Sequence, residues 1–283
     1  MRKRFSLKLR DGRVLQLGER TIVAGVLNVT PDSFSDGGEH FDAGRAVDRA
    51  LEMEGDGADI IEVGGESTRP AATPVVAGEE IARIEPVLRA VAGRLRIPIA
   101  VDTYKSEVAQ VAIELGAGIL NDVSALRFDP AIADVAARAS APLVLMHMRG
   151  NPATMQVMEP SEDIFAEIDA DLTKAVSEAL RRGVSRDQII IDPGIGFGKA
   201  LEQNLAILNC LDRFGDLDLP LMIGTSRKSF IGRLTGRLAG ERIFGTAASV
   251  AVAITRGAHL IRVHDVKQMV EVARITDAII DAH

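Results

Sequence analysis

The chain has 283 residues, 47% of them hydrophobic, so it can bury the core of one large domain without disulfide or metal support. Its 33 Lys and Arg against 40 Asp and Glu leave a net charge of −7, which argues against nucleic acid as a partner. No stretch approaches the roughly 20 apolar residues of a membrane-spanning helix, the first residues lack the apolar run of a signal peptide, and the single cysteine fits a reducing, cytoplasmic compartment.

The first predicted element is a hairpin. Apolar and polar residues alternate on both sides of Asp11-Gly12, over Phe5 to Leu9 and Val14 to Leu17. This alternation around Asp-Gly predicts two antiparallel strands joined by a tight turn. We expect the hairpin, within residues 1–18, to close the bottom of a barrel.

From Thr21 onward, eight short apolar runs alternate with segments of helical periodicity. Strands that are apolar on both faces, separated by amphipathic helices, indicate a parallel sheet covered on both sides. Eight such units favour an α/β fold of the TIM (β/α)8 barrel type, and no linker divides the chain, so we predict one domain over residues 1–283. The predicted strands are Ile22–Leu27, Asp59–Val63, Ile97–Val101, Gly118–Leu120, Leu143–Met146, Gln188–Ile191, Leu219–Ile223 and Leu260–Val263. The predicted helices are Ala43–Glu54, Glu79–Val91, Ser106–Leu115, Pro130–Ala139, Ile164–Arg181, Leu201–Leu211, Ile243–Arg256 and Val266–Ala282.

Nearly every apolar run ends at a polar residue that could take part in chemistry. One such residue would mean little, because Asn and Asp also end strands and cap helices. In a parallel barrel, however, all strand C-termini open onto one face, where active sites lie. We therefore expect a site built from Asn28, Glu62, Asp102, Asn121, Asp122, His147, Asp192, the segment 226–228, Arg262 and His264.

Two long polar loops follow the first two predicted strands. They comprise residues 28–38, with Phe34 among polar groups, and residues 64–70, with hydroxyl groups and Arg69. Each loop alone is a weak signal, because Pro and Gly mark many kinds of loop. Together they predict a cover over the mouth of the barrel.

The last two predicted strands lead into cationic segments. Arg227 and Lys228 stand where a helix would begin, although the positive end of a helix dipole disfavours cations. Arg262 and His264 flank Val263, so both side chains point to the same side of the last strand. Because Arg can bind a phosphate through two parallel hydrogen bonds, we expect an anion site here.

Three familiar kinds of site are not expected. Ala200 follows Lys199 in the glycine-bearing segment 192–199, so the phosphate-binding P-loop order is absent. His147 has no His or Cys companion at metal-ligand spacing, which argues against a zinc site. The sequence also lacks the G-x-S-x-G nucleophile elbow of serine hydrolases.

Taken in order, these motifs resemble those of the dihydropteroate synthases, the pterin-binding barrel enzymes of folate biosynthesis. The resemblance spans residues 28–265, and the two cover-loop motifs are its most specific part. Two departures are Glu62, where the family often has Asp, and residues 71–73, which replace the usual glycine after Pro70. The matching segments are residues 27–38, 64–70, 101–105, 121–124, 146–150, 192–199, 226–229 and 262–265.

The resemblance implies an enzyme that joins 6-hydroxymethyl-7,8-dihydropterin pyrophosphate to p-aminobenzoate and releases pyrophosphate by an SN1-like displacement. It also implies Mg²⁺ as cofactor, held partly by Asn28, and a cytoplasmic homodimer that sulfonamides inhibit. The implied catalytic residues are Asp102, Lys228, Arg262 and Asn28. The implied ligand contacts are Asp102, Asn121, Met146, Asp192 and Lys228 for the pterin, Asn28, Thr68, Arg262 and His264 for pyrophosphate, and Phe34, Thr68, Pro70, Phe197 and Ser229 for p-aminobenzoate. Glu62 and Asp122 are expected to position the others.

Two alternatives stay open at the level of sequence. A pterin-dependent methyltransferase on the same barrel would share the pterin pocket but would not need the two cover loops or the anion site. A non-catalytic pterin-binding paralogue would keep the fold and pocket without the chemistry. Product formation from the two substrates, with sulfonamide competition, distinguishes them.

Overall fold

The computed structural model describes residues 2–30, 43–67, 73–155 and 157–282. Eight parallel strands form one sheet in the order β8-β7-β6-β5-β4-β3-β10-β9. The sheet closes where Ile191 pairs with Leu221, beside a 3.0 Å hydrogen bond from the Ile191 N–H to the Pro220 carbonyl. The predicted barrel is therefore confirmed. Its strands are β3 (Ile22–Asn28), β4 (Ile60–Gly64), β5 (Ile99–Asp102), β6 (Ile119–Asp122), β7 (Leu143–Met146), β8 (Ile189–Asp192), β9 (Met222–Ile223) and β10 (Leu260–Val263).

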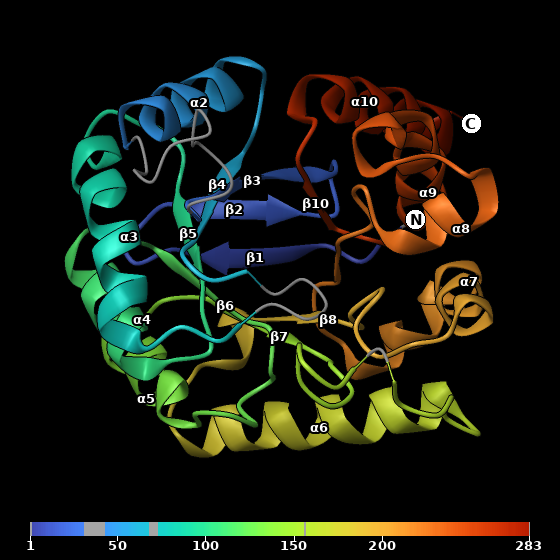
Figure 1. The fold of residues 1–283 in the computed structure, drawn as a ribbon, viewed down its shortest axis with the longest axis horizontal. Helices are drawn as coiled ribbons and strands as arrows, with labels where there is room; N and C mark the ends of the chain where they lie inside the picture. The colour runs from blue at the N-terminus through green and yellow to red at the C-terminus, as the bar shows by residue number, and fades with distance from the viewer. Residues whose placement is uncertain (1, 31–42, 68–72, 156, 283) are drawn as a thin grey trace.

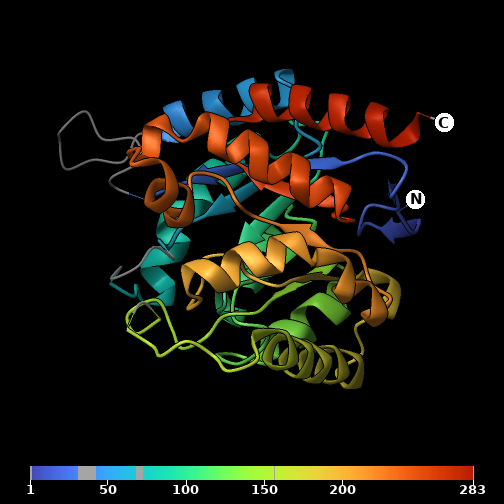
Figure 2. The ribbon, with the colours of Figure 1, turned by 90° about the vertical axis from the view of Figure 1, so that its right-hand side faces the viewer.

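Helices surround the barrel and cover the outer face of its strands (Figures 1 and 2). Their bounds lie close to the predicted ones, except that a short helix, α8, precedes α9. No helix of the described residues is long and apolar enough to cross a membrane. The helices are α2 (Ala43–Gly55), α3 (Ala77–Val91), α4 (Ser106–Glu114), α5 (Ala131–Ala139), α6 (Ile164–Arg181), α7 (Leu201–Asn209), α8 (Ser229–Thr235), α9 (Ile243–Thr255) and α10 (Val266–Asp281).

The N-terminal hairpin closes one end of the barrel, as predicted (Figure 2). Strands β1 (Phe5–Lys8) and β2 (Val14–Leu17) pair antiparallel, with Phe5 opposite Leu17. Leu7, Leu9 and Leu17 are buried in one apolar cluster with inward-facing residues near the start of the barrel strands. Burial of this kind contributes about 25 cal/mol per Å² of apolar surface. The hairpin is therefore the floor of the barrel interior, and the site has to lie at the other end.

Alternation along each strand decides which side chains enter the barrel. In β6, Ile119 packs inside with the hairpin cluster, whereas Leu120 packs outside with the helices. Because successive strand residues point to opposite faces, Asn121 points inward and Asp122 outward. The same alternation points Asp102, Met146 and Asp192, the last residues of β5, β7 and β8, inward. The C-terminal mouth is therefore lined by polar groups together with the apolar side chain of Met146.

Candidate active site

Arg262 of β10 lies at the centre of a buried charge cluster inside the barrel. Its Nη2 donates to Asp102 Oδ2 of β5 over 2.5 Å, and its Nε donates to Glu62 of β4. Glu62 in turn accepts a 3.1 Å hydrogen bond from the amide of Asn121. The side chains of Glu62 and Asp102 are 2% and 7% exposed, so this is a network of desolvated charges. Glu62 holds the Asn121 amide directly and holds Arg262, which in turn holds Asp102. These contacts agree with the positioning role expected for Glu62.

Two oxygens of this cluster are buried without a hydrogen bond from the described residues: Oδ1 of Asp102 and Oδ1 of Asn121. A buried acceptor left in this state costs about 1–3 kcal/mol. Burial raises the pKa of Asp102 to about 7, with Arg262 opposing the shift and Glu62 adding to it. The two oxygens are placed to accept from donors of a bound molecule.

Asp192 ends β8 and lies at the start of a tightly folded loop. Its Oδ1 accepts from the Gly194 N–H over 2.7 Å, and burial raises its pKa to about 6, against the effect of that hydrogen bond and of Lys228. Gly194 has φ +69°, and a Cβ there would overlap the His147 carbonyl oxygen. The glycines of this segment therefore serve close backbone packing around Asp192.

Lys199 holds the same loop from inside. Its Nζ donates to the carbonyls of Gly194 over 2.8 Å, Phe197 over 3.2 Å and His147 over 3.3 Å. Burial lowers the pKa of Lys199 to about 7, although Asp192 acts in the opposite direction. The sequence indicated only that Lys199 does not belong to a P-loop; its role as a brace for the segment was missed.

An apolar wall stands beside these polar groups. Met146 and Phe197 are buried in one cluster with Val123, Met148 and Met155. The ammonium of Lys228 lies 3.9 Å from the centroid of the Phe197 ring, which is a cation–π contact. Burial lowers the pKa of Lys228 to about 7, and Arg262 adds to this shift while Asp192 opposes it. An apolar wall bordered by hydrogen-bond acceptors and by an ammonium suits a flat heterocycle.

The predicted anion site is only partly as expected. His264 contacts the Ser226 hydroxyl through Nδ1 at 3.0 Å. Burial, with Arg262 next, lowers the pKa of His264 to about 3, so its ring is neutral and offers hydrogen bonds rather than charge. Arg227 forms a two-bonded ion pair with Asp265. In this structure Arg262 and Arg227 are both occupied by carboxylates.

Asn28 ends β3 and lies close to Asp102. Asn28 Oδ1 and Asp102 Oδ2 lie 3.8 and 3.9 Å from the point where a Cβ on Gly64 would stand. An amide oxygen and a carboxylate oxygen therefore border the same point beside Gly64, and the carboxylate oxygen accepts from Arg262. Such hard oxygen donors are the ligands that Mg²⁺ prefers.

Three of the residues predicted to bind p-aminobenzoate lie in segments that the structure does not describe. Phe34, Thr68 and Pro70 lie outside the described residues, as do residues 31–38 of the first cover loop and 68–70 of the second. Ser229 is exposed at the start of α8, next to Lys228. The p-aminobenzoate contacts therefore stay predictions.

The comparisons with known proteins agree on one family. The family model of the pterin-binding enzymes matches residues 24–264 of this chain. The dihydropteroate synthase of Escherichia coli K12 is 45% identical over 260 residues, covering 92% of each chain, and that of Synechocystis is 45% identical over 263 residues, covering 93% of this chain and 91% of the relative.

The chain belongs to the dihydropteroate synthases.

Solved structures of this family share the fold along almost the whole chain. A Xanthomonas albilineans dihydropteroate synthase with 4-aminobenzoic acid is 40% identical with a TM-score of 0.92, covering 99% of this chain and 100% of the other. A Yersinia pestis dihydropteroate synthase in a sulfonamide complex is 39% identical with a TM-score of 0.92, covering 98% and 100%. The chain is accordingly a transferase of folate biosynthesis.

This dihydropteroate synthase fold contains a second buried charge network that the sequence did not reveal. Lys105 donates to Glu66 and, over 2.5 Å, to Glu80 of α3, while the Tyr104 hydroxyl donates to Glu66 over 2.7 Å. Burial raises the pKa of Glu80, with Lys105 opposing it. Because Glu66 belongs to the second cover loop, residues 64–70, the network anchors the first part of that loop.

Asp122 acts as a positioning residue on the outer face of β6. Its carboxylate accepts from the N–H groups of Ser124 and Leu126 over 2.8 and 2.6 Å, and from the Ser124 hydroxyl over 2.7 Å. These bonds hold Ala125 and Leu126 at positive φ values of 49° and 64°. Asp122 therefore fixes the loop that follows Asn121, the role expected from the sequence.

Proposed function

We propose that the chain condenses 6-hydroxymethyl-7,8-dihydropterin pyrophosphate with p-aminobenzoate to 7,8-dihydropteroate and pyrophosphate, and that the charged barrel mouth is where this happens. The observation that carries the proposal is the pair of buried, unpartnered oxygens on Asp102 and Asn121 beside the Met146–Phe197 wall. A pterin presents amino and ring N–H donors along one edge, and those donors would satisfy the two oxygens.

In this proposal the pterin lies against Met146 with its donor edge facing Asn121, Asp192 and Asp102. The Lys228 ammonium, which lies over the Phe197 ring, donates to the pterin carbonyl. Each polar group of the pocket that a wrong ligand leaves unanswered costs about 1–3 kcal/mol. The pocket therefore discriminates against heterocycles that lack the pterin pattern of donors and acceptors.

Pyrophosphate would leave from the rim of the pocket. The C–O bond at the pterin methylene breaks and its electrons go to the pyrophosphate oxygen, which leaves a cationic pterin. The Asp102 carboxylate stabilises that cation, and Arg262, once released by Asp102, stabilises the pyrophosphate with help from the neutral His264. The arylamine nitrogen then forms the new C–N bond and loses a proton. No protein nucleophile is needed.

Mg²⁺ is the proposed cofactor, and the residues at the rim fit it. The Asn28 amide oxygen and the Asp102 carboxylate border the same point beside Gly64. Both are oxygen donors, as a hard cation requires. When bound, the ion would supply charge neutralisation for the leaving pyrophosphate.

The p-aminobenzoate pocket is proposed at the outer edge of the site. Phe197 forms one side of it and Ser229 stands at the neighbouring helix start. Phe34, Thr68 and Pro70, from the two cover loops, would complete it. The Yersinia pestis relative in a sulfonamide complex supports the expectation that sulfonamides compete for this pocket.

We also propose that the chain works as a homodimer in the cytoplasm. Leu234, Leu238 and Phe244, on and between α8 and α9, are 57%, 74% and 86% exposed. Large apolar side chains gathered on one surface are typical of an interface. Replacing Phe244 by Asp should then produce monomers in sedimentation velocity, whereas an unchanged dimer would contradict this choice of surface.

The test of the proposed function is turnover by the purified chain supplied with both substrates and Mg²⁺. We expect dihydropteroate and pyrophosphate in equal amounts, with sulfonamide inhibition competitive against p-aminobenzoate. Pterin binding without turnover would favour the non-catalytic paralogue. Loss of a methyl group from a methylated folate, without condensation, would favour the methyltransferase.

A further inference from the structure

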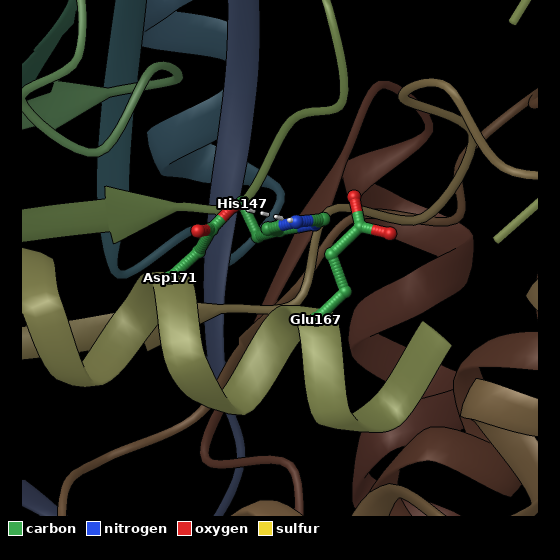
Figure 3. Close-up of side chains that lie close together, drawn as sticks. All are labelled: His147, Glu167 and Asp171. Atoms are coloured by element: carbon green, nitrogen blue, oxygen red, sulfur yellow. Dashed lines mark ion pairs between the residues drawn. The ribbon is translucent and has the colours of Figure 1, made fainter. Parts of the chain in front are cut away.

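His147, Glu167 and Asp171 come together between the end of β7 and helix α6 (Figure 3). His147 directly follows β7, and the two carboxylates stand on neighbouring turns of α6. One ligand atom from each residue lies within 4.8 Å of the others. His147 Nε2 and Asp171 Oδ2 are 3.4 Å apart.

The chain brings these groups together for simple geometric reasons. Residues 167 and 171 are four apart on a helix, so their side chains lie on the same face. Met146 points into the barrel, and the next residue, His147, turns to the opposite side, toward α6. This grouping could not be predicted from sequence, because the carboxylates lie 20 and 24 positions beyond the histidine and no His or Cys accompanies it.

His147 is the unusual member of the group. Its side chain is 1% exposed, yet neither ring nitrogen has a hydrogen bond from the described residues. A buried imidazole nitrogen that faces a carboxylate at 3.4 Å without a hydrogen bond is in position to bind a metal ion.

We propose that His147, Glu167 and Asp171 form a zinc-binding site on the outer surface of the barrel, separate from the pterin pocket. Zinc–ligand bonds of about 2.0–2.1 Å place tetrahedral ligands roughly 3.3 Å apart, close to the 3.4 Å between His147 and Asp171. Two carboxylates and one imidazole leave the fourth position open.

Space for that fourth position is present. A cavity of about 550 Å³ adjoins the group and is lined by His147, Met148, Asp171, Lys174 and the neighbouring loop. The exposed fractions of the Asp171 and Glu167 side chains are 44% and 32%, so an ion can reach them from solvent. Water or a small ligand can occupy the open position.

Glu167 decides how tightly the site binds. Its Oε1 accepts a 2.8 Å hydrogen bond from Arg149 Nε. Because the three ligand atoms spread over up to 4.8 Å, Glu167 must turn toward the ion and loosen this pair. We therefore expect His147 and Asp171 to supply most of the affinity and Glu167 less.

The histidine ligand decides which ion the site prefers, because the surrounding cations oppose Mg²⁺ and Zn²⁺ alike. Lys199, Arg127 and Arg149 all act on His147 and also oppose any cation beside it. Mg²⁺ gains little from imidazole, whereas Zn²⁺ gains a strong bond to nitrogen. The site should accordingly prefer Zn²⁺ over Mg²⁺.

The test is titration of the metal-free full chain with Zn²⁺ alone, followed by calorimetry and by competition with a fluorescent chelator. We expect one equivalent to bind, Asp171→Asn and His147→Gln to weaken association at least tenfold, and Glu167→Gln to weaken it less. Excess Mg²⁺ should not displace the ion. Co²⁺ should give the visible absorption of a tetrahedral site in the wild type, and this absorption should be absent in Asp171→Asn and His147→Gln.

Asp169→Asn, on the same helix, is the matched control and should bind Zn²⁺ like the wild type. Asp171 is partly exposed, so its variant keeps the test valid if His147→Gln fails to fold. Wild-type affinity in Asp171→Asn, or absence of binding to the wild type at a tenfold excess of Zn²⁺, would overturn the proposal. Equal loss in Asp169→Asn and Asp171→Asn would also overturn it.

Discussion

Arg262 on the last strand and Asp102 on the third strand of the barrel are joined by a 2.5 Å hydrogen bond inside the barrel mouth. The two residues are 160 positions apart, and Glu62 shares the same guanidinium. Two carboxylates thus face one cation in a desolvated space. Breaking such a buried pair by removing one partner typically costs 3–5 kcal/mol, roughly. The site is held ready by its own charges before any ligand arrives.

The raised pKa of Asp102 predicts a pH dependence of stability. Between its ordinary value near ~3.9 and about 7, the folded state binds more protons at Asp102 than the unfolded state. The free energy of unfolding therefore falls as pH rises through this window. Asp102→Asn should flatten the fall when urea unfolding is compared at pH 5 and pH 8. Glu202→Gln, which removes an exposed carboxylate, is the control and should leave the pH dependence unchanged. If Glu202→Gln flattened the pH dependence as much as Asp102→Asn, the assignment to Asp102 would be wrong.

The Asp192 loop predicts a sharp steric effect. Gly194→Ala places a Cβ against the His147 carbonyl at a positive φ, so unfolding should become easier by at least about 2 kcal/mol. Gly78→Ala, in the first turn of α3 with open space around it, should be neutral or stabilising by up to about 1 kcal/mol. Chemical unfolding of both variants measures the difference. Equal stability of the two would mean that the loop relaxes freely.

The lowered pKa of Lys228 predicts a pH dependence of pterin binding. The ammonium is the form that donates to the pterin carbonyl, and it is lost as pH rises past about 7. Affinity for the pterin alcohol should thus decline between pH 7 and pH 9, by calorimetry. Lys228→Gln should bind the pterin alcohol more weakly than the wild type at pH 6, and its affinity should decline less between pH 7 and pH 9. Since the pterin itself titrates identically with both proteins, parallel curves for the two would remove Lys228 from recognition.

Much of the fold could be predicted because it is local in sequence. Apolar runs such as Leu143–Met146 and Leu260–Val263 match observed strands, and the hairpin follows from its Asp-Gly turn. Helix α8 was missed because seven residues, Ser229–Thr235, are too few to show a helical period. Barrel closure between Ile191 and Leu221 followed from the number of units, not from any local signal.

The candidate site could be predicted only in part. The sequence indicated which polar residues reach the mouth, because each ends a strand. It could not indicate that Arg262 is occupied by Glu62 and Asp102, or that Lys199 braces the Asp192 loop, because partners 200, 160 and 52 residues distant are set by tertiary packing. The absence of a nearby His or Cys argued against a zinc site at His147; the carboxylates grouped with His147 come from helix α6, 20 and 24 residues further along the chain.

The central claim is that the mouth is divided, with the heterocycle bound by the inner groups and pyrophosphate by the rim. Calorimetry of the pterin alcohol and of its pyrophosphate ester, on Asp192→Ala and Arg262→Ala, tests it most directly. We expect Asp192→Ala to weaken both ligands on the order of 100-fold, through loss of charge-assisted hydrogen bonds. Arg262→Ala should weaken the pyrophosphate ester at least tenfold more than the alcohol. Unchanged pterin affinity in Asp192→Ala, or equal losses for the two ligands in Arg262→Ala, would contradict the account.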